Sequence, residues 1–176
     1  MNIFVLNAGR CGSTTFIKAC EHITNYTAAH ESRVHLTGDM RIDYPDNHIE
    51  ADNRLSWLLG RIDRKFGTDA HYIHLLRDRK KSVASFVKRS RFGIMKAYRE
   101  GILLGGNNQT PEQIADDYLE TIETNISLFL KDKPMASTFR LEQAEEDFKR
   151  FWQRIGAEGD LDRALNEWQI QHNASA

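Results

Sequence analysis

NAGRCGSTT at residues 7–15 follows directly on the apolar run IFVL at residues 3–6. The β-prone residues, the two glycines and the small hydroxyl residues predict a strand, a tight loop and a helix that starts near residue 13. The first turn of such a helix directs unpaired main-chain N–H groups and the positive end of the helix dipole into the loop. Phosphate and related anions bind at this geometry, so the stretch predicts an anion site.

The side chains of this loop suit an anion as well. Gly12 lets the main chain approach a ligand closely, and Arg10 supplies a fixed charge with a planar donor fork. Further donors are the hydroxyl groups of Ser13, Thr14 and Thr15. An alternative is that these residues serve only as turn and helix cap.

The loop is not a Walker A motif, which requires the pattern G-x-x-x-x-G-K-[ST]. Asn7 stands where the first glycine would be, and Ser13 stands where the lysine would be. The sequence therefore argues against an ATPase, a GTPase or a nucleotide kinase of the P-loop type.

Composition and charge narrow the class of protein. The chain has 176 residues, of which 40% are hydrophobic and 28% are charged, as in one soluble globular domain spanning residues 1–176. The net charge of −1 provides no global attraction to nucleic acid or to a membrane surface. Two cysteines are too few for a disulfide framework, and no basic segment followed by an apolar run marks a secretion signal. We therefore expect a cytoplasmic location.

Strands and helices are predicted to alternate along the chain. Apolar runs indicate strands near residues 3–6, 25–29, 72–76 and 135–139. Helical spacing indicates helices near residues 13–23, 49–66, 80–91, 110–131, 144–155 and 160–169, with surface loops at 34–48 and 101–108. This order is typical of an α/β fold with a parallel sheet. Since ligands bind at the carboxyl ends of parallel strands, the loops after residues 6 and 76 are expected on the same edge.

The segment from residue 77 to residue 99 concentrates positive charge. It contains nine basic residues and a single acidic one, Asp78. The basic residues are Arg77, Arg79, Lys80, Lys81, Lys88, Arg89, Arg91, Lys96 and Arg99. A solvated helix face is one explanation. The other is a second phosphate site, for which Arg77 and Ser85 offer a guanidinium fork and a hydroxyl group.

Two segments of the chain resemble the sulfotransferase family. The family's nucleotide-binding loop reads roughly [KR]-S-G-[ST]-T after the first strand, and residues 10–14 read RCGST. Its second motif is R-D-P with a serine eight residues after the arginine, and here RDR at residues 77–79 is followed by Ser85 at that spacing. The segment TFRLE at residues 138–142 is similar to a strand-plus-acid segment near the family's C-terminal end. The resemblance implies a three-layer α/β/α architecture with a central parallel sheet, like that of P-loop NTPases.

The resemblance also implies a reaction and a cofactor. Sulfotransferases move a sulfuryl group from 3′-phosphoadenosine 5′-phosphosulfate (PAPS) to a hydroxyl or amine, release 3′-phosphoadenosine 5′-phosphate (PAP), and need no metal. By resemblance, Arg77 and Ser85 would bind the 3′-phosphate in a pocket separate from the first. The 5′-phosphosulfate would be bound by Arg10, Cys11, Gly12, Ser13, Thr14 and Thr15.

The chain departs from the family pattern in several ways. Arg10 replaces the lysine common in cytosolic members, Cys11 replaces serine, and Arg79 replaces proline. The chain is also short for the family, so the segments that bind the acceptor must be reduced or supplied by a partner.

The catalytic residues suggested by the resemblance are Arg10, Glu31 and His30. Arg10 would stabilise charge on the bridging oxygen of the donor. The acceptor needs a base, which is a glutamate after the second strand in several branches of the family and a histidine in the cytosolic branch. Glu31 is preferred here over His30, although an exposed loop carboxylate and a structural histidine are the plainer interpretations.

Other classes of function remain open at this point. A nucleotide kinase would need Mg²⁺ and a phosphate-binding lysine. A non-catalytic module could bind a nucleotide or nucleic acid through the basic helix near residues 80–91. The preferred hypothesis has a small-molecule or carbohydrate acceptor as partner, and neither nucleic acid nor a membrane.

Overall fold

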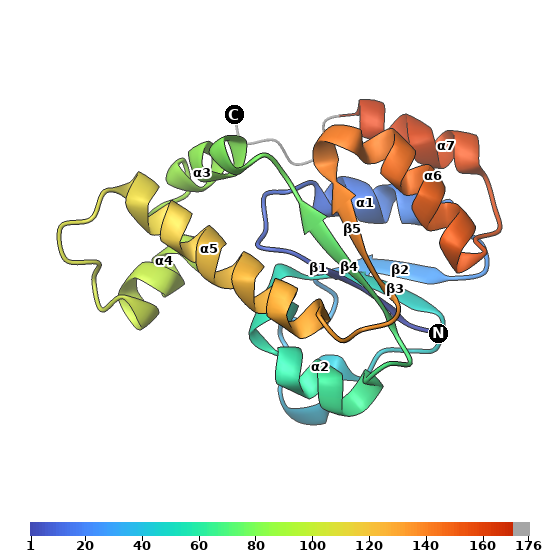
Figure 1. Cartoon of the computed structure of the whole chain (residues 1–176), viewed down its shortest axis with the longest axis horizontal. Helices are drawn as coiled ribbons and strands as arrows, with labels where there is room; N and C mark the ends of the chain where they lie inside the picture. The colour runs from blue at the N-terminus through green and yellow to red at the C-terminus, as the bar shows by residue number, and fades with distance from the viewer. Residues whose placement is uncertain (171–176) are drawn as a thin grey trace.

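One parallel β-sheet organises the chain (Figure 1). The computed structural model describes residues 1–170, and its five strands lie in the order β2-β3-β1-β4-β5. Every pairing is parallel, and Ile3 in the central strand pairs with Ile49 on one side and His71 on the other. The strands are β1 (Ile3–Leu6), β2 (Thr27–His30), β3 (His48–Ala51), β4 (His71–Leu76) and β5 (Ala136–Arg140).

Helices cover both faces of this sheet. In Figure 1, α1, α6 and α7 lie on one face, and α2 and α5 lie on the other. The helices are α1 (Ser13–Cys20), α2 (Leu59–Phe66), α3 (Arg79–Val87), α4 (Gly93–Ala97), α5 (Pro111–Leu130), α6 (Ala144–Ile155) and α7 (Leu161–Asn166). This is the three-layer α/β/α architecture with a central parallel sheet that the sequence predicted. Within residues 1–170, none of the helices combines the length and the apolar character that crossing a bilayer requires.

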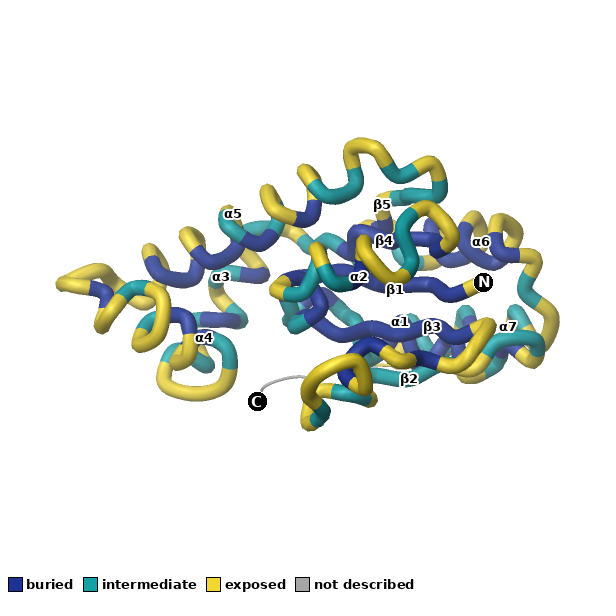
Figure 2. The backbone as a smooth tube through the Cα atoms, turned by 90° about the horizontal axis from the view of Figure 1, so that it is seen from below, coloured by how far each residue is buried: buried dark blue, intermediate teal, exposed yellow. Residues whose placement is uncertain are grey.

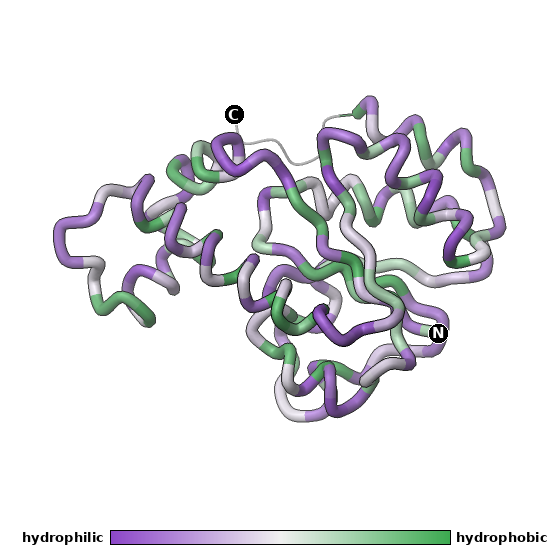
Figure 3. The backbone as a smooth tube through the Cα atoms, viewed as in Figure 1, coloured by the Kyte–Doolittle hydropathy of each residue, from purple (hydrophilic) through white to green (hydrophobic). Residues whose placement is uncertain are grey.

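Two apolar layers hold the helices on the sheet. In one layer Phe16 of α1 packs against Phe139 of β5, with ring centroids 5.0 Å apart. In the other, Phe129 of α5 packs against Tyr72 of β4 at 5.1 Å. Every residue of β1 is buried, as expected for a parallel sheet covered on both faces. Figures 2 and 3 show that the central strand β1 is buried and largely hydrophobic, whereas the outward turns of the helices are exposed and largely hydrophilic.

The predicted helix at residues 49–66 is wrong over its first part. Strand β3 occupies its beginning, a 3₁₀ turn follows at Asn53–Trp57, and α2 starts only at Leu59. The strand escaped prediction because it is not an apolar run. His48 and Glu50 are buried in it and interact with each other at 3.0 Å, so two polar residues stand where a buried strand normally has apolar ones.

Two other boundaries differ from the prediction. Helix α3 is shorter than the helix predicted at residues 80–91, and a separate α4 begins at Gly93. The predicted surface loop at residues 34–48 includes a 3₁₀ turn, Gly38–Ile42, in which Arg41 is buried. A buried arginine needs a carboxylate partner inside the fold, which a sequence pattern does not reveal.

The N-terminus of α5 confirms a prediction made from its sequence. Thr110 Oγ1 accepts a hydrogen bond from the main chain of Gln113 at 3.3 Å, and Gln113 Oε1 accepts one from the main chain of Thr110 at 2.9 Å. Pro111 occupies the first helical position, where its missing N–H costs nothing. This capping box fixes the start of the helix that supports the candidate site described next.

Candidate functional site

The loop between β1 and α1 has a conformation that few side chains tolerate. Gly9, Arg10 and Gly12 have φ angles of 93°, 59° and 90°, all in the left-handed region. Helix α1 begins directly after Gly12, and no side chain caps its N-terminus. A Cβ atom at Gly12 would lie 2.7 Å from Cδ1 of Leu141, so the Leu141 side chain would have to move to accommodate a larger residue. The geometry leaves the first N–H groups of α1 available to an anion.

Side chains from distant elements hold this loop in place. The hydroxyl of Tyr118 on α5 donates a hydrogen bond to the main-chain oxygen of Ala8 at 2.8 Å. Ser56 Oγ donates to the main-chain oxygen of Asn7 at 2.9 Å. Asn7 Oδ1 in turn accepts from the N–H of Gly9 at 2.9 Å. The loop is therefore held in its shape by the fold itself, which reduces the cost of ordering it around a ligand.

The second predicted motif contacts the first directly. Arg77, at the end of β4, donates a hydrogen bond from Nη1 to the main-chain oxygen of Arg10 at 2.9 Å. Arg10 Nε donates to Ser85 Oγ on α3 at 3.0 Å. The two segments lie on the same edge of the sheet, as the strand order predicts, and form one continuous surface in place of two separate pockets.

A cavity of about 600 Å³ opens in front of this surface. Of the residues that the sequence singled out, its lining includes Arg10, Gly12, Ser13, Thr14, Thr15, His30, Glu31 and Arg77. Residues from other elements complete the wall, among them Asn53, Arg54, Phe86, Arg89, Phe92, Leu141 and Trp168. Ser85 is absent from the lining and reaches the cavity only through its contact with Arg10.

Positive charge is concentrated at this cavity. Burial lowers the pKa of Arg10, and the neighbouring charges of Arg89 and Arg77 lower it further. Arg89 also lies over the ring of Phe92, with 5.7 Å between Cζ and the ring centroid. Like charges gathered on one wall repel each other, so an anion placed among them would relieve an unfavourable interaction.

Three other residues of the basic segment form ion pairs with nearby carboxylates. Arg79 pairs with Asp116 at 2.6 Å and with Glu120 at 2.9 Å on α5, and these hydrogen bonds raise its pKa. Lys96 and Arg99 lie 3.9 and 3.1 Å from Glu100. This part of the segment is thus a helix surface whose basic residues form ion pairs.

Cys11 does not line the cavity. Its thiol is buried and lies 3.4 Å from Asn7 Oδ1, and burial raises its pKa to about 12. The thiol is therefore protonated near neutral pH and unsuited to act as a nucleophile. A contact between Cys11 and an anion would have to use its main-chain N–H.

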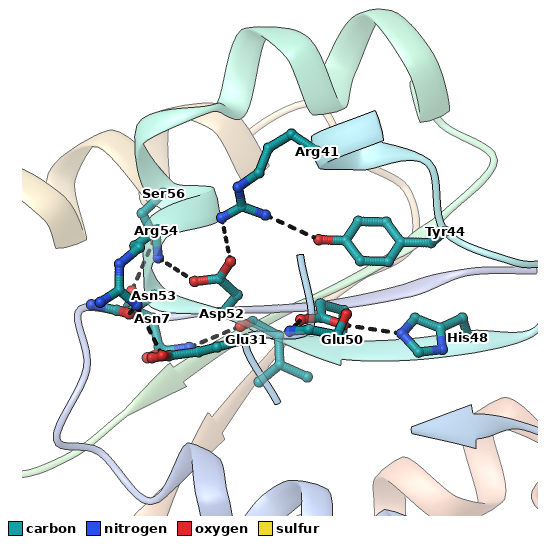
Figure 4. Close-up of polar contacts among 12 residues, drawn as sticks. Asn7, Glu31, Arg41, Tyr44, His48, Glu50, Asp52, Asn53, Arg54 and Ser56 are labelled. Atoms are coloured by element: carbon teal, nitrogen blue, oxygen red, sulfur yellow. Dashed lines mark hydrogen bonds and ion pairs between the residues drawn. The ribbon is translucent and has the colours of Figure 1, made fainter. Parts of the chain in front are cut away.

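His30 and Glu31 both reach the cavity from the end of β2. His30 Nε2 lies 3.0 Å from Ser13 Oγ, which links it to the first turn of α1. Glu31 has a φ angle of 51° and forms an ion pair with Arg54 at 2.9 Å (Figure 4). The carboxylate is partly exposed, so it can meet a ligand that enters the cavity.

Arg54 is a charged residue at this site that the sequence did not reveal. It was assigned to the interior of the predicted helix at residues 49–66, where a lone arginine carries no signal. The structure places it in the 3₁₀ turn after β3. The sequence clue was the alternation of Glu50 and Asp52, which in a strand brings both carboxylates to one face.

Comparison with known sequences gives no assignment. No protein-family model matches the chain, and no curated protein matches it at a significant level.

Comparison with solved structures is informative. The sulfotransferase domain from the curacin biosynthetic pathway matches 96% of this chain and 78% of its own length, with a TM-score of 0.65 and 15% sequence identity. Mouse sulfotransferase SULT7A1, solved in complex with PAP, matches 96% of this chain and 63% of its own length, with a TM-score of 0.56 and 13% identity. Identities this low establish similarity of fold and not of reaction. The chain thus has the fold of the sulfotransferases.

Proposed function

We propose that this protein is a sulfotransferase that uses PAPS as donor. The observation that carries the proposal is the convergence of three guanidinium groups, those of Arg10, Arg77 and Arg89, on one cavity at the N-terminus of α1. A donor with a 3′-phosphate and a 5′-phosphosulfate has the charge to match such a wall. The fold shared with two sulfotransferases supports the same choice.

In this proposal the first loop binds the phosphosulfate. The N–H groups at the start of α1 and the hydroxyls of Ser13, Thr14 and Thr15 donate hydrogen bonds to its oxygens. Arg10 stabilises the charge that builds on the bridging oxygen as the S–O bond breaks. Arg77 binds the 3′-phosphate, and Ser85 contributes through the hydrogen bond that it accepts from Arg10. Sulfuryl transfer then proceeds as an in-line displacement, in which the protein mainly positions the reactants and stabilises charge.

The acceptor hydroxyl loses its proton to a base in the same proposal. Glu31 is preferred because its carboxylate lines the cavity and is held by Arg54. His30 is the alternative, and it contacts Ser13 at the start of α1. The acceptor is a small molecule or a carbohydrate.

Thermal unfolding in the presence of nucleotides tests the choice of donor. We expect PAP to raise the melting temperature more than ATP or AMP does, with the same shift whether Mg²⁺ or EDTA is present. Stabilisation by ATP that requires Mg²⁺ would favour a kinase. A salt-sensitive response to single-stranded nucleic acid without any response to PAP would favour a binding module. Either of these results would reject the sulfotransferase.

A further inference from the structure

Two acidic residues are completely buried: Glu50 in β3, and Asp52 just after the end of the strand. Glu50 and Asp52 are both 0% exposed, and their spacing of two residues places them on one face of the strand. A buried carboxylate is costly unless hydrogen bonds and opposite charges compensate for its lost hydration. Their partners therefore reveal what these residues hold in place (Figure 4).

Glu50 holds the turn that follows β2. Its Oε1 accepts a hydrogen bond from the main-chain N–H of Ser32 at 2.7 Å, and its Oε2 accepts one from Ser32 Oγ at 2.6 Å. Oε2 also lies 3.0 Å from His48 Nε2. Ser32 follows Glu31, whose left-handed backbone is unfavourable for a residue with a side chain. Glu50 thus stabilises the turn at the point where its backbone is strained.

Asp52 holds Arg54, the other member of the ion pair with Glu31. Its Oδ1 accepts a hydrogen bond from the main-chain N–H of Arg54 at 2.8 Å, and its Oδ2 pairs with the buried guanidinium of Arg41. Burial raises the pKa of Asp52, and the contacts with Arg54 and Arg41 oppose that rise. Asp52 thereby fixes the first turn of the 3₁₀ segment that carries Arg54.

We infer that Glu50 and Asp52 are positioning residues that together hold Glu31 and Arg54 in their ion pair at the cavity. Each carboxylate bonds to the main chain beside or at one member of the pair, and the pair itself closes at 2.9 Å. Because Glu31 and Arg54 come from separate segments, a rigid strand between them sets their separation better than either loop could. The catalytic meaning of this arrangement rests on the proposed function, in which Glu31 is the base; the arrangement itself does not.

The first test needs no ligand. Arginine side-chain ¹⁵N–¹H spectra report the Arg54 Nε–H signal, assigned by its loss in Arg54→Lys. Glu50→Gln and Asp52→Asn are expected to move this signal toward its position in Glu31→Gln, where the pair is absent. His71→Gln is the matched control, because His71 is a buried polar residue that bonds to Ser137 Oγ at 3.1 Å and begins β4, away from the cavity. Its spectrum should keep the Arg54 signal of the original protein.

Retention of the original Arg54 signal in folded Glu50→Gln and Asp52→Asn would overturn the inference. If those two variants do not fold, Ser32→Ala provides a milder change that removes only the 2.6 Å hydroxyl contact. A partial shift of the Arg54 signal in Ser32→Ala supports the inference, and an unchanged signal rejects it.

The second test asks whether Glu50 acts through Glu31. The probe is the conversion of PAPS to PAP with water as the acceptor. Glu50→Gln should lower kcat about 10- to 100-fold while the KM for PAPS changes little, since a displaced base slows the transfer and leaves donor binding intact. In a Glu31→Gln background the same substitution should have no further effect on kcat. Independent, multiplicative losses would mean that Glu50 stabilises the fold in general.

The two tests separate the inference from the proposed function. If the unsubstituted protein neither binds PAP nor converts PAPS, the proposed function fails, and the Arg54 signals still decide whether the carboxylates of β3 hold the pair.

Discussion

Arg10 and Ser85 lie 75 residues apart in the sequence, yet Arg10 Nε donates a hydrogen bond to Ser85 Oγ at 3.0 Å. This contact joins the loop after β1 to α3, and Arg77 reinforces it by donating to the main-chain oxygen of Arg10. The cavity wall is therefore a single unit assembled from two segments. A ligand that bridges both segments would bind more tightly than one that meets either alone.

Arg77→Ala should weaken PAP binding about 10- to 100-fold, as expected when a hydrogen bond to a charged group is lost. AMP, which lacks the 3′-phosphate, should lose less affinity. Isothermal titration calorimetry with both nucleotides measures the two effects. Arg79→Ala is the matched control, because Arg79 is bound to Asp116 and Glu120 on α5 and should leave PAP affinity unchanged. Equal losses for PAP and AMP in Arg77→Ala would place the 3′-phosphate elsewhere.

Gly12→Ala should destabilise the protein and abolish nucleotide binding. The φ angle of 90° opposes a side chain and costs about 1–3 kcal/mol, and a Cβ would also displace Leu141, whose Cδ1 lies 2.7 Å away. Gly60→Ala in α2 is the control, since a Cβ there meets no heavy atom within 4 Å and alanine favours a helix. Urea unfolding of both variants provides the comparison. A Gly12→Ala protein of unchanged stability would mean that the loop adopts another backbone conformation.

Stability should fall as the pH is lowered from 6.5 towards 4, partly through His74. Burial, and then the charge of Arg140, lower the pKa of His74 from 6.5 to about 4. Between these values the unfolded chain binds a proton that the folded chain does not, so the free energy of unfolding decreases with decreasing pH. His74→Leu removes this difference. Its stability relative to the unsubstituted protein should rise by about 1.5 kcal/mol between pH 6.5 and pH 5.

Urea unfolding at the two pH values measures the effect of His74→Leu. His74 Nε2 has no hydrogen-bond partner among the described residues, so leucine also removes an unsatisfied polar atom. That gain is the same at both pH values and cancels in the comparison. An identical difference at pH 6.5 and pH 5 would show that His74 titrates in the folded state much as it does in the unfolded chain.

The sequence predicted those parts of the structure that local patterns determine. Thr110 and Gln113 form a capping box because both partners lie within one turn of a helix. The loop after β1 could be predicted because its glycines and hydroxyl residues follow a strongly apolar strand. The spacing from Arg77 to Ser85 pointed to the second segment, although its direct contact with Arg10 was not foreseen.

The parts that escaped prediction depend on contacts between distant residues. Strand β3 contains His48 and Glu50, whose polar groups are satisfied by each other and by Thr27 and Ser32. Such partners cannot be seen in a window of sequence, and so the strand was assigned to a helix. The same error concealed Arg54, because its role depends on the turn that β3 ends in.

Glu31→Gln should slow sulfuryl transfer strongly while leaving PAP affinity within about twofold of the original, since the variant keeps the shape of the side chain and loses only its basicity. Loss of a general base typically costs about 10²–10⁴ in rate. His30→Gln is the paired variant. It should lower the rate less, because in this proposal Glu31 takes the proton and His30 only contacts Ser13. Release of PAP from PAPS, with 4-methylumbelliferone and N-acetylglucosamine as trial acceptors and water as background, measures both rates. The reverse order, an active Glu31→Gln and an inactive His30→Gln, would make the imidazole the base and reduce Glu31 to a partner of Arg54.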